Sequence, residues 1–226
     1  MLCAITAATI IYIIYRVRVK QILKMYKLRS SIAKDLHDDV GSALSSIALL
    51  SKIAQEEKIN SSLKPEQIFS RISDTSKRMI DLMDDIVWSV NPDNDRFENM
   101  IIRMREYAVE MLEAKNIQFS FLISENMSDV KIPMQLRKDY FLIFKEAVNN
   151  LAKYSEASTA LLSIDKEGNM IITTIKDNGT GFDADLIHSG NGLKNMKQRA
   201  HDLKATLDIQ TVKGEGTTII LQLPVT

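Results

Sequence analysis

The chain has 226 residues with 29 basic and 29 acidic side chains, so its formal net charge is zero. A length of this order allows one or two domains, each with a core of its own. The balanced charge supplies no basic field and argues against nucleic-acid binding. The single cysteine, Cys3, excludes an intramolecular disulfide and a multi-cysteine metal site.

An uncharged apolar tract comes first, at residues 2–15. It is shorter than the roughly 20 residues that span a bilayer. Seven Lys and Arg residues and no acidic residue follow between Arg16 and Lys34, which is typical of a segment whose C-terminal side faces the cytoplasm. A signal peptide would carry its basic stretch before the apolar one. We interpret residues 1–20 as a transmembrane and juxtamembrane segment, the tail of a longer span. The alternative is a packed N-terminal helix.

Two stretches then place apolar residues at spacings of three and four, which defines one face of a bundle helix. The members of the two seams are Leu28, Ile32, Leu36, Val40, Ala43, Ile47, Leu50 and Ala54, and then Ile68, Ile72, Thr75, Met79, Leu82 and Ile86. A lone hairpin leaves such a seam in water, whereas two hairpins bury it in a four-helix bundle. We therefore expect residues 21–91 to form a dimerisation hairpin.

The segment Asn91-Pro92-Asp93-Asn94-Asp95 breaks the second helix. A helical pattern over Phe97–Glu113 makes residues 92–114 a connecting helix. Beyond it, strand-like and helical patterns follow each other. Strands are expected at Ile117–Ile123, Thr159–Asp165, Met170–Asp177, Thr206–Thr211 and Thr217–Leu223, and helices at Leu136–Tyr154 and Gly192–Leu203. One sheet against a helical layer predicts an α+β sandwich over residues 115–226.

Six of the eight glycines form three Gly-x-Gly pairs near the C-terminus, at Gly179/Gly181, Gly190/Gly192 and Gly214/Gly216. Glycine permits positive φ and a close approach of backbone to a ligand. The first pair belongs to Asp177-Asn178-Gly179-Thr180-Gly181, and Glu146-Ala147-Val148-Asn149-Asn150 lies upstream. This order of motifs resembles the ATP-binding domain shared by gyrase, heat-shock chaperones and sensor histidine kinases.

Two further tracts extend the resemblance upstream. Residues 35–47, Asp-Leu-His-Asp-Asp-Val-Gly-Ser-Ala-Leu-Ser-Ser-Ile, are similar to the phosphoacceptor helix of histidine kinases in which Asp directly follows the His. Asp84-Asp85-Ile86-Val87-Trp88-Ser89-Val90-Asn91-Pro92 is similar to the second bundle helix of that subfamily. The resemblance therefore runs from about residue 28 to the C-terminus.

The resemblance implies a role for each motif. His37 would be the phosphoacceptor, and Asp38 would fix its tautomer and take its proton. Glu146 would lie near the metal's water shell or the reacting phosphate. Asn150 would coordinate Mg²⁺. Asp177 would accept a hydrogen bond from the adenine amino group, because a carboxylate is an acceptor only.

The resemblance also implies that ATP and Mg²⁺ are the cofactors. The remaining nucleotide contacts would come from Lys153, Tyr154, Gly179, Gly181, Gly190, Gly192, Leu193, Gly216 and Thr217. Tyr154 departs from the subfamily, in which His is common at this position.

These features predict a sensor histidine kinase that acts as a homodimer at the inner (cytoplasmic) membrane, with its catalytic part in the cytoplasm. It would phosphorylate itself on His37 from Mg-ATP and pass the phosphoryl group to an aspartate of a response regulator. One alternative is a nucleotide-binding dimeric scaffold, a pseudokinase without transfer activity. Another is a soluble serine kinase with the same ATP fold, which would lack the His-bearing hairpin. The signal, the regulator, and transfer in cis or in trans stay open.

Ser42 generates a prediction about the reverse reaction. It lies four residues after Asp38, where the subfamily commonly carries a glutamine that positions water for dephosphorylating the regulator. A serine hydroxyl is shorter than a glutamine amide and offers fewer hydrogen-bonding groups. We expect weak regulator phosphatase activity and a faster rate in Ser42→Gln, measured as decay of purified phospho-regulator. Fast decay with Ser42 in place, unchanged in the variant, would contradict this prediction.

Overall fold

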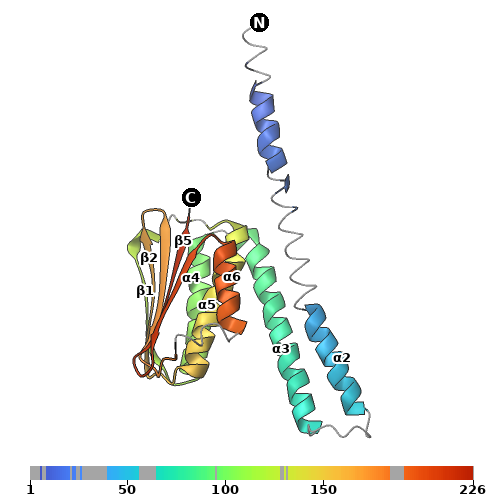
Figure 1. Cartoon of the computed structure of the whole chain (residues 1–226). Helices are drawn as coiled ribbons and strands as arrows, with labels where there is room; N and C mark the ends of the chain where they lie inside the picture. Colours follow the sequence, from blue (N-terminus) through green and yellow to red (C-terminus); the bar gives the residue numbers. More distant parts are fainter. Residues whose placement is uncertain are drawn as a thin grey trace. The chain divides into compact units, whose positions relative to one another are not determined.

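The computed structural model describes residues 6, 9–20, 22–23, 26, 40–55, 65–94, 96–127, 130, 132–183 and 191–225. Contacts along the chain divide it into two compact units, Met1–Val87 and Trp88–Thr226. Their helices and strands carry the labels of Figure 1.

The first unit is helical. It contains a helix over residues 9–20, α2 (Gly41–Gln55) and most of α3 (Pro65–Val90). Nearly all side chains of residues 9–20 are exposed. Among the residues that the structure describes, no helix combines the length and the apolar character needed to cross a bilayer. Residues 2–5, 7 and 8 of the predicted apolar tract lie outside the described residues, as do Leu28, Ile32 and Leu36 of the first seam.

The described part of both predicted seams coincides with the less exposed positions of α2 and α3. On α3 these are Ile68, Ile72, Thr75, Met79, Leu82 and Ile86, and on α2 they are Ala43, Ile47, Leu50 and Ala54. No residue of α2 is buried, so its seam is only half covered. Beside the α3 seam, Ile80 is 59 % exposed and Met83 is 47 % exposed. The helices therefore keep apolar surface in contact with water.

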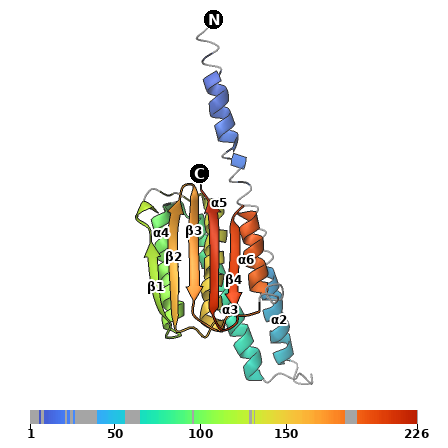
Figure 2. The same ribbon diagram turned by 60° about the vertical axis from the view of Figure 1, so that its left-hand side comes forward.

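The second unit is built on a five-stranded sheet in the order β1-β2-β3-β5-β4 (Figure 2). The strands are β1 (Gln118–Ile123), β2 (Thr159–Glu167), β3 (Met170–Asp177), β4 (Thr206–Val212) and β5 (Gly216–Pro224). Both predicted hairpins are confirmed, because β2 pairs with β3 and β4 with β5 in antiparallel register. β1 pairs with β2 in parallel, and α5 (Met134–Tyr154) lies between them in the chain. Such a parallel connection needs a crossover, which a helix usually supplies.

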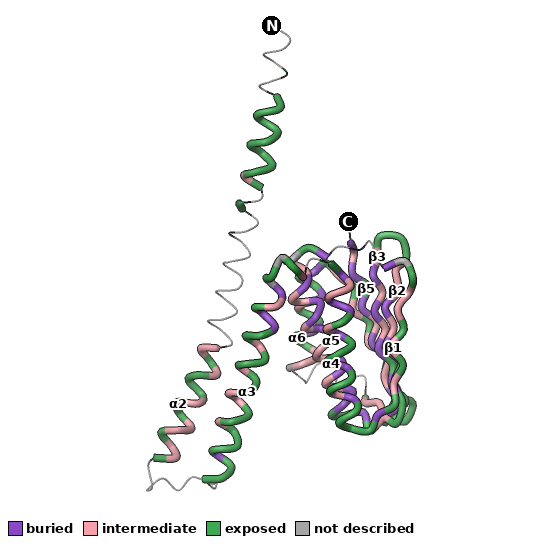
Figure 3. Tube along the Cα trace, turned by 180° about the vertical axis from the view of Figure 1, so that it is seen from behind, coloured by how far each residue is buried: buried purple, intermediate pink, exposed green. Residues whose placement is uncertain are grey.

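Helices cover one face of the sheet. They are α4 (Phe97–Glu113), α5 and α6 (Asn191–Asp202). Two short 3₁₀ helices, η2 (Pro92–Asn94) and η3 (Glu125–Met127), connect the longer elements. The buried residues lie between the helices and the sheet, where Figure 3 shows the purple segments. A helical region followed by an α/β sheet domain agrees with the predicted fold class.

The alternation of side chains along β3 places Asp177 on the buried face of the sheet. Successive side chains point to opposite faces of a strand. On β3 the buried positions are Ile171, Thr173, Ile175 and Asp177, so a carboxylate ends an otherwise inward-facing row. Thr173 is satisfied within the core by a hydrogen bond to the hydroxyl of Tyr140 on α5. Burial raises the pKa of the Tyr140 phenol, which therefore stays neutral.

The end of α3 is tied to the second unit. The indole of Trp88 lies under the guanidinium of Arg103, 4.6 Å from its ring centre. Asn94 donates a hydrogen bond of 2.9 Å to the Trp88 carbonyl. The buried guanidinium of Arg137 donates a bond of 3.0 Å to the Asn91 carbonyl. Trp88 and the residues that follow it therefore belong to the second unit.

Candidate functional site

A cavity of about 660 Å³ lies between α5, α6 and the inner face of the sheet. Its size falls in the range of cofactor and small-molecule pockets. The residues that line it are Glu146, Ala147, Asn150, Leu151, Tyr154, Ser155, Ile175, Asp177, Gly181, Phe182, Gly192, Leu193, Thr217 and Ile219. Most of the cavity is apolar, and a few polar groups are placed around it. Such a lining is typical of small-molecule and cofactor sites.

Asp177 is the buried acidic group of this cavity, with 6 % of its surface exposed. Its Oδ1 accepts a 2.8 Å bond from the Gly179 amide and a 3.3 Å bond from the Thr217 amide. Burial raises the pKa of the Asp177 carboxyl, and the two amide bonds oppose that shift. No hydrogen bond from the described residues reaches Oδ2. This oxygen can therefore accept a hydrogen bond from a ligand in the cavity.

Two glycines allow the chain after Asp177 to pack against the β4–β5 hairpin. Gly181 has a φ of +55° and Gly216 a φ of +89°, a region that favours glycine. A Cβ at Gly181 would collide with the Val212 carbonyl, and one at Gly216 would collide with the Asp177 carbonyl. These glycines therefore serve contacts within the protein, which bring the ligand-facing residues together.

The same segment is attached to the C-terminal end of α5. The Thr180 amide donates a 2.7 Å bond to the Ser155 carbonyl. A Cβ at Gly179 would collide with that carbonyl. Gly179 and Gly216 thus lie behind the cavity wall, since neither lines the cavity. Ser155 lines it and was not a candidate in the sequence, because a single serine after a helix carries no distinctive signal.

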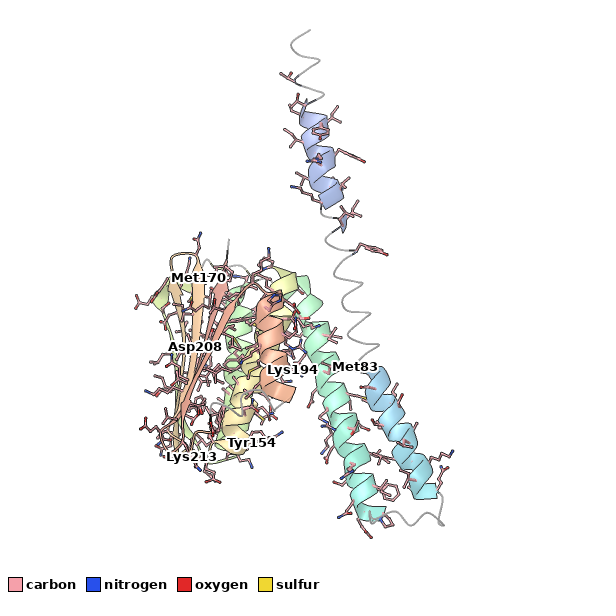
Figure 4. The ribbon with its side chains drawn as sticks, viewed as in Figure 1. Met83, Tyr154, Met170, Lys194, Asp208 and Lys213 are labelled. Atoms are coloured by element: carbon pink, nitrogen blue, oxygen red, sulfur yellow. The ribbon has the colours of Figure 1, made fainter. Side chains whose placement is uncertain are left out.

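Helix α5 presents two polar residues to the cavity, Glu146 and Asn150. They are four apart, which places them on one helix face. Tyr154, one turn further and labelled in Figure 4, lines the cavity but is 72 % exposed. Lys153 is exposed and does not line the cavity. The predicted helix face is therefore present, with Lys153 outside it.

The first turn of α6 forms another part of the wall, through Gly192 and Leu193. A Cβ at Gly192 would collide with the carboxylate of Glu146, so this carboxylate lies against the start of α6. The first amides of a helix have no partner within the helix and carry a partial positive charge. The cavity thus combines an acidic side chain with a helix end that attracts anions.

Three predicted site residues, His37, Asp38 and Gly190, lie outside the described residues. Within the described part, no group of three His, Cys, Asp or Glu residues could hold a metal ion alone. Any cation near Glu146 and Asn150 would therefore take further ligands from a bound molecule or from water.

Two interactions of this unit have no local sequence signal. Arg199 of α6 donates a 2.7 Å bond to the Asp139 carboxylate of α5, and both side chains are about three-quarters buried. Arg199 thus joins the two helices α5 and α6. The hydroxyl of Thr211 on β4 contacts both Phe182 and Thr217. Lys194, labelled in Figure 4, is exposed and lies outside the cavity lining.

Two family models match the chain. The model described as histidine kinase-, DNA gyrase B- and HSP90-like ATPase matches residues 136–226. That match contains every residue of the cavity lining. A second model, described as histidine kinase, matches residues 29–95. The chain belongs to the sensor histidine kinases. Its ATPase-like domain implies ATP binding, which agrees with a cavity that holds a buried acidic group.

Curated relatives agree with this assignment. The chain is 22 % identical over 210 residues to the sensor protein VraS of Staphylococcus haemolyticus, covering 92 % of this chain and 58 % of the relative. It is 23 % identical over 216 residues to VraS of Staphylococcus aureus, covering 94 % of this chain and 59 % of the relative. This histidine kinase chain therefore spans less than three-fifths of the length of these relatives.

Solved structures show the same fold. The histidine kinase AdeS of Acinetobacter baumannii aligns with a TM-score of 0.56 at 16 % identity, covering 80 % of this chain and 95 % of that one. The kinase domain of the blue-light activated histidine kinase of Erythrobacter litoralis aligns with a TM-score of 0.52 at 12 % identity, covering 82 % and 94 %. At these identities the likeness extends to the fold alone.

The variant Asp177→Asn should lower nucleotide affinity without lowering the stability of the fold. The oxygen of the introduced amide can still accept the two backbone bonds, but an NH₂ group replaces the free acceptor Oδ2. We expect nucleotide affinity to fall about 10- to 150-fold, the range for a hydrogen bond to a charged group. Isothermal titration with ATP measures this loss.

The stability of the same variant should not fall. Because burial raises the folded-state pKa of Asp177, the contribution of this carboxyl to stability is lost as the pH rises through that pKa. A neutral amide avoids this loss, so at pH 7 the melting temperature of Asp177→Asn should equal or exceed that of the wild type. A lower melting temperature together with unchanged affinity would contradict the assigned role.

Proposed function

We propose that this chain binds Mg-ATP in the cavity, transfers the γ-phosphoryl group to His37, and passes it to an aspartate of a response regulator. One observation carries the proposal. The buried Asp177 carboxylate has an oxygen available to a ligand, in the same cavity as Glu146, Asn150 and the start of α6. This arrangement offers an acceptor for an exocyclic amine and a separate place for phosphates.

The two ends of the nucleotide are assigned from the positions along α5. Asp177 lies near Ser155, because Gly179 and Thr180 contact the Ser155 carbonyl. Glu146 lies against the start of α6, nine residues earlier and about 13 Å along the helix at 1.5 Å per residue. We assign the adenine to the Asp177 end, between apolar side chains such as Ile175 and Ile219, and the phosphates to the Glu146 end.

The residues present fit a magnesium ion. A phosphate beside the Glu146 carboxylate would be repelled unless a cation lay between them. The amide oxygen of Asn150 and the carboxylate of Glu146 are oxygen ligands of the kind that Mg²⁺ prefers, and Mg²⁺ keeps several waters. Asn150 would hold the ion and Glu146 would order its water shell. The ion supplies charge neutralisation of the phosphates.

The transfer step forms one bond and breaks another. An imidazole nitrogen of His37 attacks the γ-phosphorus, a P–N bond forms, and the bond to the bridging β–γ oxygen breaks, so that ADP leaves. The proton of the other imidazole nitrogen passes to Asp38. Phosphoryl transfer depends mainly on positioning and charge neutralisation, which the α5 and α6 groups would provide.

We also propose that the helical unit dimerises. The support is the half-covered seam of α2 and α3 and the exposed apolar side chains beside it, such as Met83 (Figure 4). A second copy of the hairpin would bury this surface in a four-helix bundle. Family membership adds support for a response regulator as the partner that receives the phosphoryl group.

His37→Gln tests the transfer directly. Incubation with γ-labelled ATP should place an acid-labile, base-stable label on the wild type. The variant should lose at least about 99 % of the label, because glutamine has no nucleophilic imidazole. ATP affinity and dimerisation should be unchanged, since His37 flanks the predicted seam. A labelled His37→Gln protein would contradict the mechanism, and ATP binding without any label in the wild type would favour the scaffold alternative.

We further propose that residues 1–20 attach the chain to the cytoplasmic membrane, with the catalytic part in the cytoplasm. The support is the apolar tract followed by seven basic residues between Arg16 and Lys34. A deletion that starts the chain near Lys20 should move to the soluble fraction, remain dimeric and still label itself. If the full chain is equally soluble without detergent, the anchor is wrong and residues 2–15 form a packing helix.

A further inference from the structure

Thr211 lies beside the Asp177 end of the cavity, to which the adenine is assigned, and next to Phe182 in the chain that follows Asp177. It is on β4 and pairs with Thr217 on β5. Its Oγ1 is 3.2 Å from the Thr217 Oγ1 and accepts a 3.0 Å bond from the Phe182 amide. Thr217 and Phe182 both line the cavity, whereas Thr211 does not. Thr211 thus contacts two cavity residues from behind.

The single proton of a threonine hydroxyl limits how these bonds can run. A threonine hydroxyl has one proton to donate and two lone pairs to accept with. Because Thr211 Oγ1 accepts from the Phe182 amide, its proton remains for one other group. The available acceptors are the Thr217 hydroxyl at 3.2 Å and the carbonyls of Phe182 and Gly216, both at 3.4 Å. When Thr211 donates to Thr217, the proton of Thr217 is free to point into the cavity.

We propose that Thr211 is a positioning residue that makes the Thr217 hydroxyl a donor toward the nucleobase. This inference rests on the proposed function, and it assigns base selectivity to a residue outside the cavity lining. Asp177 then supplies an acceptor and Thr217 a donor. The two groups are adjacent, because the Thr217 amide donates to the Asp177 carboxylate.

An acceptor beside a donor matches one purine edge. Adenine presents an amine donor next to a ring-nitrogen acceptor. Hypoxanthine has a carbonyl oxygen and a ring N–H at these positions. The Asp177 acceptor would then face another acceptor and the Thr217 donor another donor, so neither hydrogen bond forms. Without the Thr211 proton, the Thr217 hydroxyl loses its fixed direction and can accept from a base as well as donate to one. Selectivity for ATP over ITP should therefore depend on Thr211.

The bond between Thr211 and the Phe182 amide requires the chain after Asp177 to pass close to the β4–β5 hairpin. Phe182 directly follows Gly181. The backbone of Gly181 can pack on Val212 because glycine has no Cβ to collide with the Val212 carbonyl. The Gly214 amide adds a 2.6 Å bond to the Thr180 carbonyl. These contacts hold the Phe182 amide within reach of Thr211, which keeps one of its lone pairs occupied.

The test compares Mg-ATP and Mg-ITP affinities by isothermal titration on the full chain. Thr211→Val removes the hydroxyl at nearly constant shape and should lower the ATP affinity about three- to tenfold while ITP binding holds or improves. Thr211→Ser keeps the hydroxyl and should restore the wild-type ratio. Thr211→Ala is a second hydroxyl-free variant, used if Val lowers the melting temperature.

A double-mutant cycle distinguishes positioning from general support. If Thr211 acts through Thr217, Thr211→Val should change the ATP-to-ITP ratio no further in a Thr217→Val background. A wild-type ratio in Thr211→Val and Thr211→Ala, or additive effects in the double variant, would overturn the inference while leaving ATP binding by the wild type intact. A wild type that binds neither nucleotide would overturn the proposed function and this inference with it.

Discussion

The site depends on one buried carboxylate at the end of an apolar strand. The inward row of β3 continues from Ile171 through Ile175 to Asp177, so the pleat that builds the core also carries a negative charge into it. The desolvation raises the pKa of this carboxyl, and no described cation pairs with it. Only the amides of Gly179 and Thr217 offset the burial. Buried carboxylates with a perturbed pKa cluster at functional sites.

The surrounding packing follows from this constraint. The chain must turn immediately after Asp177 and return an amide to its own carboxylate, and β5 must begin close enough for Thr217 to donate as well. Both conditions need backbone approaches without a Cβ, which Gly179, Gly181 and Gly216 provide. These three glycines thus act mainly on the protein's own backbone. Their effect on a nucleotide is indirect, because they place Asp177, Thr217 and Phe182 around one cavity.

Local patterns were sufficient for most elements of the fold. The helix predicted over Phe97–Glu113 has those bounds, and α5, α6 and both hairpins lie where periodicity and turn residues placed them. The parallel pairing of β1 with β2 was not predicted, because strand partners far apart in sequence leave no local pattern. The Arg199–Asp139 pair and the contact of Thr211 with Phe182 were missed for the same reason. For the site, the motifs identified Glu146, Asn150 and Asp177, whereas Lys153 lies outside the cavity lining.

The central claim is that the Asp177 carboxylate recognises adenine in the cavity between α5, α6 and the sheet. A structure of the protein with a non-hydrolysable ATP analogue and magnesium tests it most directly. The account predicts the adenine amine within about 3 Å of Asp177 Oδ2 and the phosphates between Asn150 and the start of α6. An adenine bound elsewhere, or turned so that its amine points away from Asp177, would contradict it.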